Sequence, residues 1–222
     1  SGGNSTAHPE QPYLMFRYES AHKGIVAAAS PDGRRWRDFA GICVAAGDRC
    51  TAMYHESLRK YHIITRVPGR NVRTCGLWES EDLQTWTFTK ELLEPDMDDV
   101  EAVMGADGGG KQTAKPETEF YGLYTFRWGG VYLGYLELFH EAERTLDSEL
   151  VFSRDGYSWQ RTRQIFLPRG GAGSWDQAWV FPAHNPPLAV GNKLFIYYQG
   201  RQTRPWADTP YGHIGSIGLA TL

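Results

Sequence analysis

The sequence predicts an all-β protein built from repeated antiparallel units. A pattern, Ser-x-Asp-(Gly or Leu)-x-x-Trp, occurs three times, beginning at Ser30, Ser80 and Ser153. Aromatic residues make up 14% of the chain and there are 25 glycines, which favours strands joined by many tight turns. Copies of one motif spaced by roughly 50 and 73 residues are typical of a repeat fold with one β-unit per copy.

Each copy of the motif has the chemistry of a hairpin turn. An apolar strand runs into the serine, the aspartate can accept hydrogen bonds from backbone N–H groups two residues on, and glycine supplies a positive φ. The serine hydroxyl can tie the turn to the strand before it. The tryptophan opens the next strand, where it can cap the hairpin or wedge between neighbouring units. An ordinary Asp-Gly turn would explain one copy, but three copies with the same offsets indicate a shared unit.

Runs of β-branched and aromatic residues between turn signals divide the chain into four units. The predicted strands are 12–18, 25–29 and 36–39 in the first unit, 48–54, 60–66, 73–79 and 86–92 in the second, 119–124, 131–139, 148–152 and 159–163 in the third, and 175–181, 192–200 and 213–222 in the fourth. We expect residues 1–222 to form a single domain, with loops at 1–12 and 94–117. The carboxylates near 96–101 lack the ordered spacing of a calcium loop, so a solvated loop is favoured there.

Composition narrows the classes of partner. A net charge of −3 and a pI near 6.2 give no electrostatic reason to expect nucleic acid or an anionic membrane, and no apolar run is long enough to cross a bilayer. The cysteines, Cys43, Cys50 and Cys75, lack metal-ligand spacing. We expect free thiols, with a Cys43–Cys50 disulfide as the alternative in an exported protein, and we predict neither a metal nor a cofactor. The compartment stays open.

A family resemblance emerges from these units. The run Gly173-Ser174-Trp175-Asp176 and the later run Leu-Phe-Ile-Tyr-Tyr-Gln-Gly at 194–200, with the meanders and Ser-x-Asp turns, resemble the five-bladed β-propellers of glycoside hydrolase families 32 and 43, above all their family-32-N-terminal-like branch. The resemblance covers nearly the whole chain from Tyr13. It implies a β-propeller of four-stranded antiparallel blades, with about four blades visible. Sialidases carry a related turn, the Asp box, so the turn indicates a propeller without fixing one reaction.

The resemblance also implies a site on the ring axis, at the starts of the innermost strands. Glu119 falls where the family carries its acid, and Asp48 falls where a second-blade aspartate orients or stabilises the substrate. Asp176 lies at the matching end of the fourth unit and is the candidate base or nucleophile. The aspartate expected on the first blade has no clear counterpart. The candidate substrate-binding residues are Arg49, Trp175, Trp179, His184 and His213.

Each candidate also has a plainer interpretation. Glu119 can be a solvated residue at a strand edge, Asp48 can form a surface ion pair with Arg49, and Asp176 can cap its turn. The histidines can be loop or core residues, and the tryptophans can fill gaps between blades.

The expected function is therefore a glycoside hydrolase-like propeller that cleaves an oligosaccharide or polysaccharide fragment by carboxylate acid/base chemistry. A non-catalytic propeller that binds a glycan or a protein is the alternative, and the missing first-blade carboxylate favours it. The chain stops where a fourth turn is expected, so a third hypothesis is a truncated propeller whose ring a second copy completes, which would make the protein a homo-oligomer.

Overall fold

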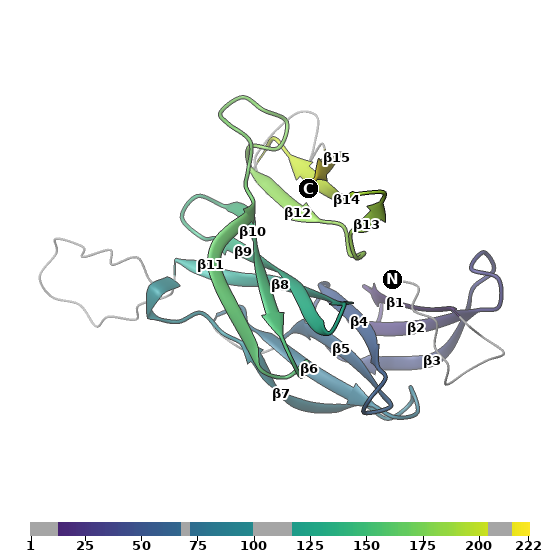
Figure 1. Ribbon diagram of the computed structural model, residues 1–222. Helices are drawn as coiled ribbons and strands as arrows, with labels where there is room; N and C mark the ends of the chain where they lie inside the picture. Colours follow the sequence, from purple (N-terminus) through teal and green to yellow (C-terminus); the bar gives the residue numbers. More distant parts are fainter. Residues whose placement is uncertain (1–12, 68–71, 100–116, 204–214) are drawn as a thin grey trace, which may run out of the picture.

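The computed structural model describes residues 13–67, 72–99, 117–203 and 215–222, without the side chains of 39–42 (Figure 1). These ranges are almost entirely β-structure, with one short 3-10 helix, η1 (Met97–Asp99). The first unit is a three-stranded sheet of β1 (Tyr13–Glu19), β2 (Gly24–Ser30) and β3 (Arg37–Val44). The second is a four-stranded sheet of β4 (Cys50–His55), β5 (Lys60–Arg66), β6 (Cys75–Ser80) and β7 (Thr87–Leu93).

The third and fourth units share one eight-stranded sheet. The third is the meander β8 (Thr118–Trp128), β9 (Val131–His140), β10 (Thr145–Ser153) and β11 (Trp159–Leu167). The fourth contains β12 (Trp179–Pro182), β13 (Leu188–Val190), β14 (Lys193–Arg201) and β15 (Gly215–Thr221). A single parallel pairing of Leu146 with Trp179 joins the two units. The predicted antiparallel meanders are thereby confirmed, with the innermost strand of the fourth unit split into β12 and β13, which both pair with β14.

The three Ser-x-Asp turns have the same geometry. In the turn at Ser153, the hydroxyl of Ser153 donates to Asp155 at 2.9 Å and accepts from the backbone N–H of Gly156 at 2.9 Å. The Asp155 carboxylate accepts from the N–H groups of Tyr157 and Ser158 at 2.8 and 2.7 Å. The turns at Ser30 and Ser80 repeat these bonds within 0.2 Å. The residue after each aspartate has a positive φ, as expected for the turn.

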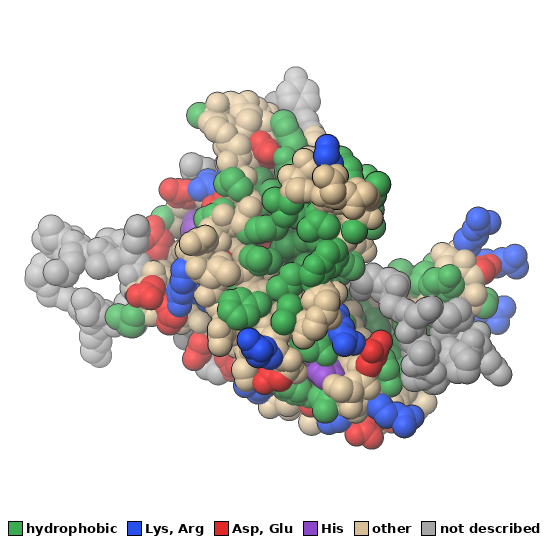
Figure 2. Space-filling view, in the orientation of Figure 1, with side chains coloured by type: hydrophobic (Ala, Val, Ile, Leu, Met, Phe, Trp, Pro, Cys, Tyr) green, Lys and Arg blue, Asp and Glu red, His purple; other side chains and the backbone are tan. Residues whose placement is uncertain are grey.

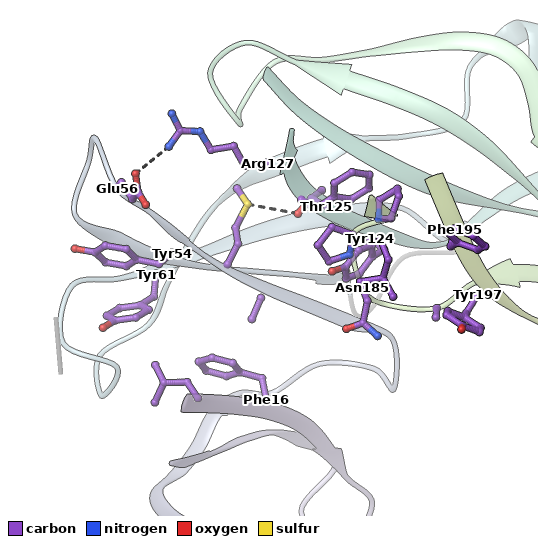
Figure 3. Close-up of a pocket in the computed structure, with 18 residues that line it drawn as sticks. Phe16, Tyr54, Glu56, Tyr61, Tyr124, Thr125, Arg127, Asn185, Phe195 and Tyr197 are labelled. Carbon is purple, nitrogen blue, oxygen red and sulfur yellow. Dashed lines mark hydrogen bonds and ion pairs between the residues drawn. The ribbon is translucent and has the colours of Figure 1, made fainter. Parts of the chain in front are cut away.

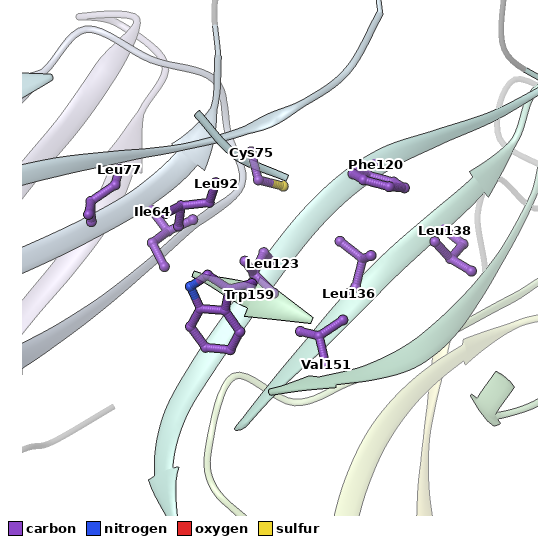
Figure 4. Packing of buried hydrophobic residues seen from close by; sticks show 10 residues of the cluster. All are labelled: Ile64, Cys75, Leu77, Leu92, Phe120, Leu123, Leu136, Leu138, Val151 and Trp159. Carbon is purple, nitrogen blue, oxygen red and sulfur yellow. The ribbon is translucent and has the colours of Figure 1, made fainter. Parts of the chain in front are cut away.

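The hydrophobic core lies between neighbouring sheets. Ile64 and Leu77 of the second unit pack against Phe120, Val151 and Trp159 of the third (Figure 4). Similar clusters join the first unit to the second and the third to the fourth. Successive units therefore pack against one another in chain order, and the first strand of the second unit, β4, lies against both β1 and β8. This packing brings the innermost strands of successive units together.

One face of the fourth unit is not covered by the other described residues. Ile217 and Leu219 of β15 are 81% and 47% exposed, and Leu188 and Tyr197 on the neighbouring strands are also exposed. An apolar cleft of about 550 Å³ begins beside them and is lined by residues of all four units (Figure 3). Figure 2 shows hydrophobic side chains gathered across the middle of the side of the molecule that faces the viewer. The cleft lies toward the ends of β4 and β8, away from their starts.

Two expectations about polar residues have clear outcomes. Cys43, Cys50 and Cys75 form no disulfide, as predicted, so the alternative Cys43–Cys50 bridge is absent. The first part of the 94–117 segment differs from the expected solvated loop, because Asp99 is buried and pairs with Arg161 of β11 at 2.6 Å. Arg161 and Arg163 of β11 hold this part of the segment by pairing with Asp96 and Asp99. Residues 100–116 lie outside the described ranges.

Candidate functional site

Three arginines of the second unit converge on one tyrosine of the third. Tyr121 lies near the start of β8, and the guanidinium carbons of Arg49, Arg66 and Arg73 lie 5.6, 4.9 and 5.9 Å from the centre of its ring. Arg49 precedes β4, Arg66 ends β5 and Arg73 precedes β6. Cations at these distances from an aromatic face are attracted by its quadrupole. The starts of the innermost strands β4 and β8 therefore meet at Tyr121.

Each of these arginines is paired with a carboxylate. Arg66 pairs with Asp48, whose side chain is half exposed, and Arg73 pairs with Glu119, which is buried. Arg73 also donates to Glu141 at 2.9 Å. Asp48 and Glu119 thus belong to one cluster, which we call the Tyr121 cluster. Its members are Tyr121, Arg49, Arg66, Arg73, Asp48, Glu119, Glu137 and Glu141.

The pair of Arg49 and Glu137 forms the buried floor of the cluster. The side chain of Glu137 is 2% exposed, and its carboxylate accepts from Arg49 Nε at 3.0 Å. His184 Nε2 lies 3.2 Å from Arg49 Nη2, and its ring stacks on Tyr124 at 5.1 Å. Burial acts to raise the pKa of Glu137, but Arg49 and His184 outweigh it, and the pKa is lowered. Glu137 is therefore held as a carboxylate.

A glycine in β8 makes room for this buried pair. A Cβ atom at Gly122 would lie 2.7 Å from Glu137 Oε2, so any other residue would push the carboxylate aside. The space left among Arg49, Gly122, Glu137 and His184 is only about 10 Å³, less than a water molecule needs to sit comfortably. The buried pair of Arg49 and Glu137 therefore leaves no room for a ligand at the floor of the cluster.

Comparison with known proteins bears on the fold. No protein-family model matches the chain, and no curated protein matches it in sequence. Among solved structures, it is similar to β-1,2-mannobiose phosphorylase from Listeria innocua (TM-score 0.59, 15% identity, 90% of this chain and 49% of that one) and to sucrose-6-phosphate hydrolase from Lactobacillus gasseri (0.59, 15%, 89% and 39%). A Bombyx mori family 32 β-fructofuranosidase is also similar (0.53, 12%, 88% and 40%).

The chain has the fold of the glycoside hydrolase β-propellers. This confirms the family resemblance and the all-β propeller class predicted from the sequence, and we call the four units blades. The chain spans about half or less of the length of these three neighbours. At 12–15% identity the likeness shows the fold alone, so the chemistry has to be argued from the site.

The candidate residues of the fourth blade are divided between two places. His184 reaches the floor of the Tyr121 cluster, whereas Asp176 lies in the loop before β12, where it accepts hydrogen bonds from Tyr198 and Ser174 at 3.0 Å each. Trp175 is 40% exposed and stacks on Tyr198. Within the described ranges, no contact of Asp176 reaches Asp48 or Glu119. Its proposed role as base or nucleophile stays a prediction.

The other two candidates are Trp179 and His213. Trp179 is 4% exposed, its ring packs against Tyr121 and Phe139, and its Nε1 donates to the carbonyl of Arg144 at 2.9 Å. In this position Trp179 of the fourth blade packs edge-on against Tyr121 and Phe139 of the third and fills the space between the two blades. His213 lies outside the described residues.

Sequence reasoning missed Glu137 and Glu141. Glu137 is the only charged side chain within β9, in the run Val-Tyr-Leu-Gly-Tyr-Leu-Glu-Leu-Phe. A lone carboxylate in such an apolar strand needs a buried partner, which is a signal that could have identified it. In the described ranges, no group of three or more histidine, cysteine, aspartate or glutamate side chains is placed to hold a metal. Nor do these ranges contain a helix with the length and apolarity that a membrane span requires.

Proposed function

We propose that the protein is a glycoside hydrolase-like propeller that binds an oligosaccharide at the Tyr121 cluster and cleaves a glycosidic bond there. The observation that carries the proposal is that Arg66 and Arg73, which pair with Asp48 and Glu119 respectively, both lie over the ring of Tyr121. Glycoside hydrolysis requires two carboxyl groups beside the scissile bond. This cluster supplies them from adjacent blades of a fold that glycoside hydrolases share.

The composition of the cluster suits a neutral sugar. Sugar hydroxyls both donate and accept hydrogen bonds, and here guanidinium donors lie beside carboxylate acceptors. The three arginines are matched by four carboxylates, so an anionic ligand would gain little from the net charge. In this proposal Glu119 protonates the leaving oxygen and Asp48 holds the substrate. Asp176, in the loop before β12, is the candidate base or nucleophile.

The test is sugar release by wild type and matched variants. The substrates are β-1,2-mannobiose and sucrose, the sugars named with related structures, together with a panel of aryl glycosides and oligosaccharides. Replacing Glu119 by Gln keeps its size and removes the transferable proton, so turnover should fall by about 100-fold or more. Asp48→Asn should lower it as well. Glu81→Gln, on an exposed outer turn, is the control and should match wild type. Unchanged turnover in Glu119→Gln would remove Glu119 from the mechanism.

A second candidate function is glycan binding without cleavage. The specific observation in its favour is that Asp48, Glu119 and Glu137 each pair with an arginine, an arrangement of donors and acceptors that can bind sugar hydroxyls without any proton transfer. A glycan array followed by calorimetry separates the two functions. Binding that weakens in Arg66→Gln, with no sugar released from any bound glycan, would select the binding function.

A further inference from the structure

A second polar cavity lies between the second and third blades, at the opposite ends of their innermost strands. It has a volume of about 390 Å³ and lies beside the β4–β5 turn, the β8–β9 turn and the Ser153 turn. His55 at the end of β4 and Arg127 near the end of β8 both line it, whereas Asp48 and Glu119 lie at the starts of the same strands. This cavity is therefore separate from the Tyr121 cluster, and its chemistry can be considered independently.

The hydrogen bonds of His55 leave one donor in this cavity without an acceptor. The backbone carbonyl of Asp155 can only accept, so His55 Nε2, 3.1 Å away, must carry the proton. Tyr132 Oη lies 3.0 Å from the same Nε2 and hence accepts as well. The hydroxyl proton of Tyr132 then remains for another acceptor, and Tyr132 has no further hydrogen bond within the described residues. This conclusion holds whether the His55 ring is neutral or charged.

Two arginines add positive charge around this hydroxyl. Arg154 is exposed, lines the cavity, and makes no ion pair or hydrogen bond with the described part of the chain. Arg127 donates to Glu56 at 2.9 Å, but both side chains are more than half exposed, so the pair is weak (Figure 3). Asp155 also lines the cavity; its Oδ1 accepts from the N–H groups of its own turn, and its Oδ2 is left as an acceptor. The guanidinium N–H groups of Arg154 and Arg127 together with the Tyr132 hydroxyl still outnumber the carboxylate oxygens available to them.

We infer that this cavity binds an oxyanion, such as the phosphate or carboxylate group of a small ligand, between Arg154, Arg127 and the Tyr132 hydroxyl. Guanidinium groups bind such oxygens by charge-assisted hydrogen bonds, and the tyrosine supplies the directional contact. The site is particular to the third blade. In the corresponding turns of the first and second blades the position of Arg154 is occupied by Pro31 and Glu81, which cannot donate to an anion.

Calorimetric titration at constant ionic strength tests this site, with inorganic phosphate and acetate as separate probes. Arg154→Gln and Tyr132→Phe should each weaken binding by about tenfold, the usual effect of one charged or buried hydrogen bond. Glu56→Gln should strengthen binding, because it frees Arg127 from its carboxylate. Arg35→Gln is the control: Arg35 is exposed in the first-blade turn, away from the cavity, and should match wild type.

The outcomes discriminate between ligands and between sites. Tighter binding of phosphate than of acetate assigns a phosphate-bearing ligand, and the reverse assigns a carboxylate. Binding that is equally strong in Arg154→Gln, Tyr132→Phe and wild type places the anion elsewhere and overturns the inference, as does the absence of binding for both probes at tens of millimolar. Arg154 is exposed and unpaired in the described structure, so its variant keeps the test valid if Tyr132→Phe folds poorly.

Discussion

The outer Ser-x-Asp turns and the Tyr121 cluster are both polar, but the residues that bond to each other are close in sequence in the turns and far apart in sequence in the cluster. In each turn, the serine and aspartate side chains bond groups two or three residues away. In the cluster, Arg66 and Asp48 are 18 residues apart, Arg73 and Glu119 are 46 apart, and Arg49 and Glu137 are 88 apart. The turns can form before the blades meet, whereas the cluster exists only once the second and third blades have stacked.

This difference indicates that the turns stabilise the fold, whereas the Tyr121 cluster is the candidate functional site. Local bonds repeat in three blades because the same short sequence repeats. The cluster occurs once, at the junction of two blades, and places exposed groups such as Asp48 beside buried ones such as Glu137. Three variants test this contrast, and they are arranged from the largest expected effect to the smallest.

Arg49→Met should give the largest loss of stability. It removes the partner of Glu137 and leaves a buried carboxylate uncompensated, which costs about 3–5 kcal/mol of unfolding free energy. Urea denaturation at pH 7 measures the loss. The matched variant is Arg66→Met, whose partner Asp48 is half exposed, and it should cost less than about 1 kcal/mol. Equal losses in both variants would mean that burial does not distinguish the two ion pairs.

Leu83→Gly should cost less. Leu83 occupies the turn position that glycine holds in the other two copies, with φ of 65°, yet its side chain is 1% exposed and packs with Leu14 of the first blade. Removing the side chain loses about 2–5 kcal/mol of packing, and relief of the left-handed backbone returns about 1–2 kcal/mol. Thermal denaturation should therefore show a net loss. A gain in stability would show that backbone strain outweighs the contact between the blades.

Asp82→Asn should have the smallest effect, visible mainly in acid. The backbone N–H groups of Thr85 and Gln84 favour the carboxylate and lower the pKa of Asp82 from 3.8 to about 2. A lowered pKa gives stability above pH 4 that is lost as the pH falls toward 2. The variant should therefore lose less stability than wild type between pH 4 and 2. Glu81→Gln, its exposed neighbour, is the control, and a slope like that of wild type in Asp82→Asn would contradict this account.

The repeated turns and the sheets could be predicted from the sequence because their determinants are local. Ser153, Asp155 and Gly156 specify their turn almost by themselves, and alternating apolar runs specify the strands. The family resemblance placed Asp48 and Glu119 at the starts of innermost strands; Glu119 is the second residue of β8, and Asp48 lies two residues before β4.

The partners of these carboxylates could not be predicted in the same way. The pairing of Arg49 with Glu137 depends on the register of β9 against β8 and on the stacking of two blades, neither of which is encoded within a short window. Asp99 illustrates the same limit. Its acidic segment predicts a solvated loop, and only the folded structure shows that Arg161 of β11 pairs with it. Burial and partner choice are properties of the assembled blades.

The most direct test of the central claim is a crystal structure of the protein soaked in turn with β-1,2-mannobiose and with sucrose. The account predicts a sugar at the starts of β4 and β8, with its hydroxyls bonded to Asp48 and Glu119. Density for the sugar only in the apolar cleft or on the outer turns, with the Tyr121 cluster empty in both soaks, would contradict it.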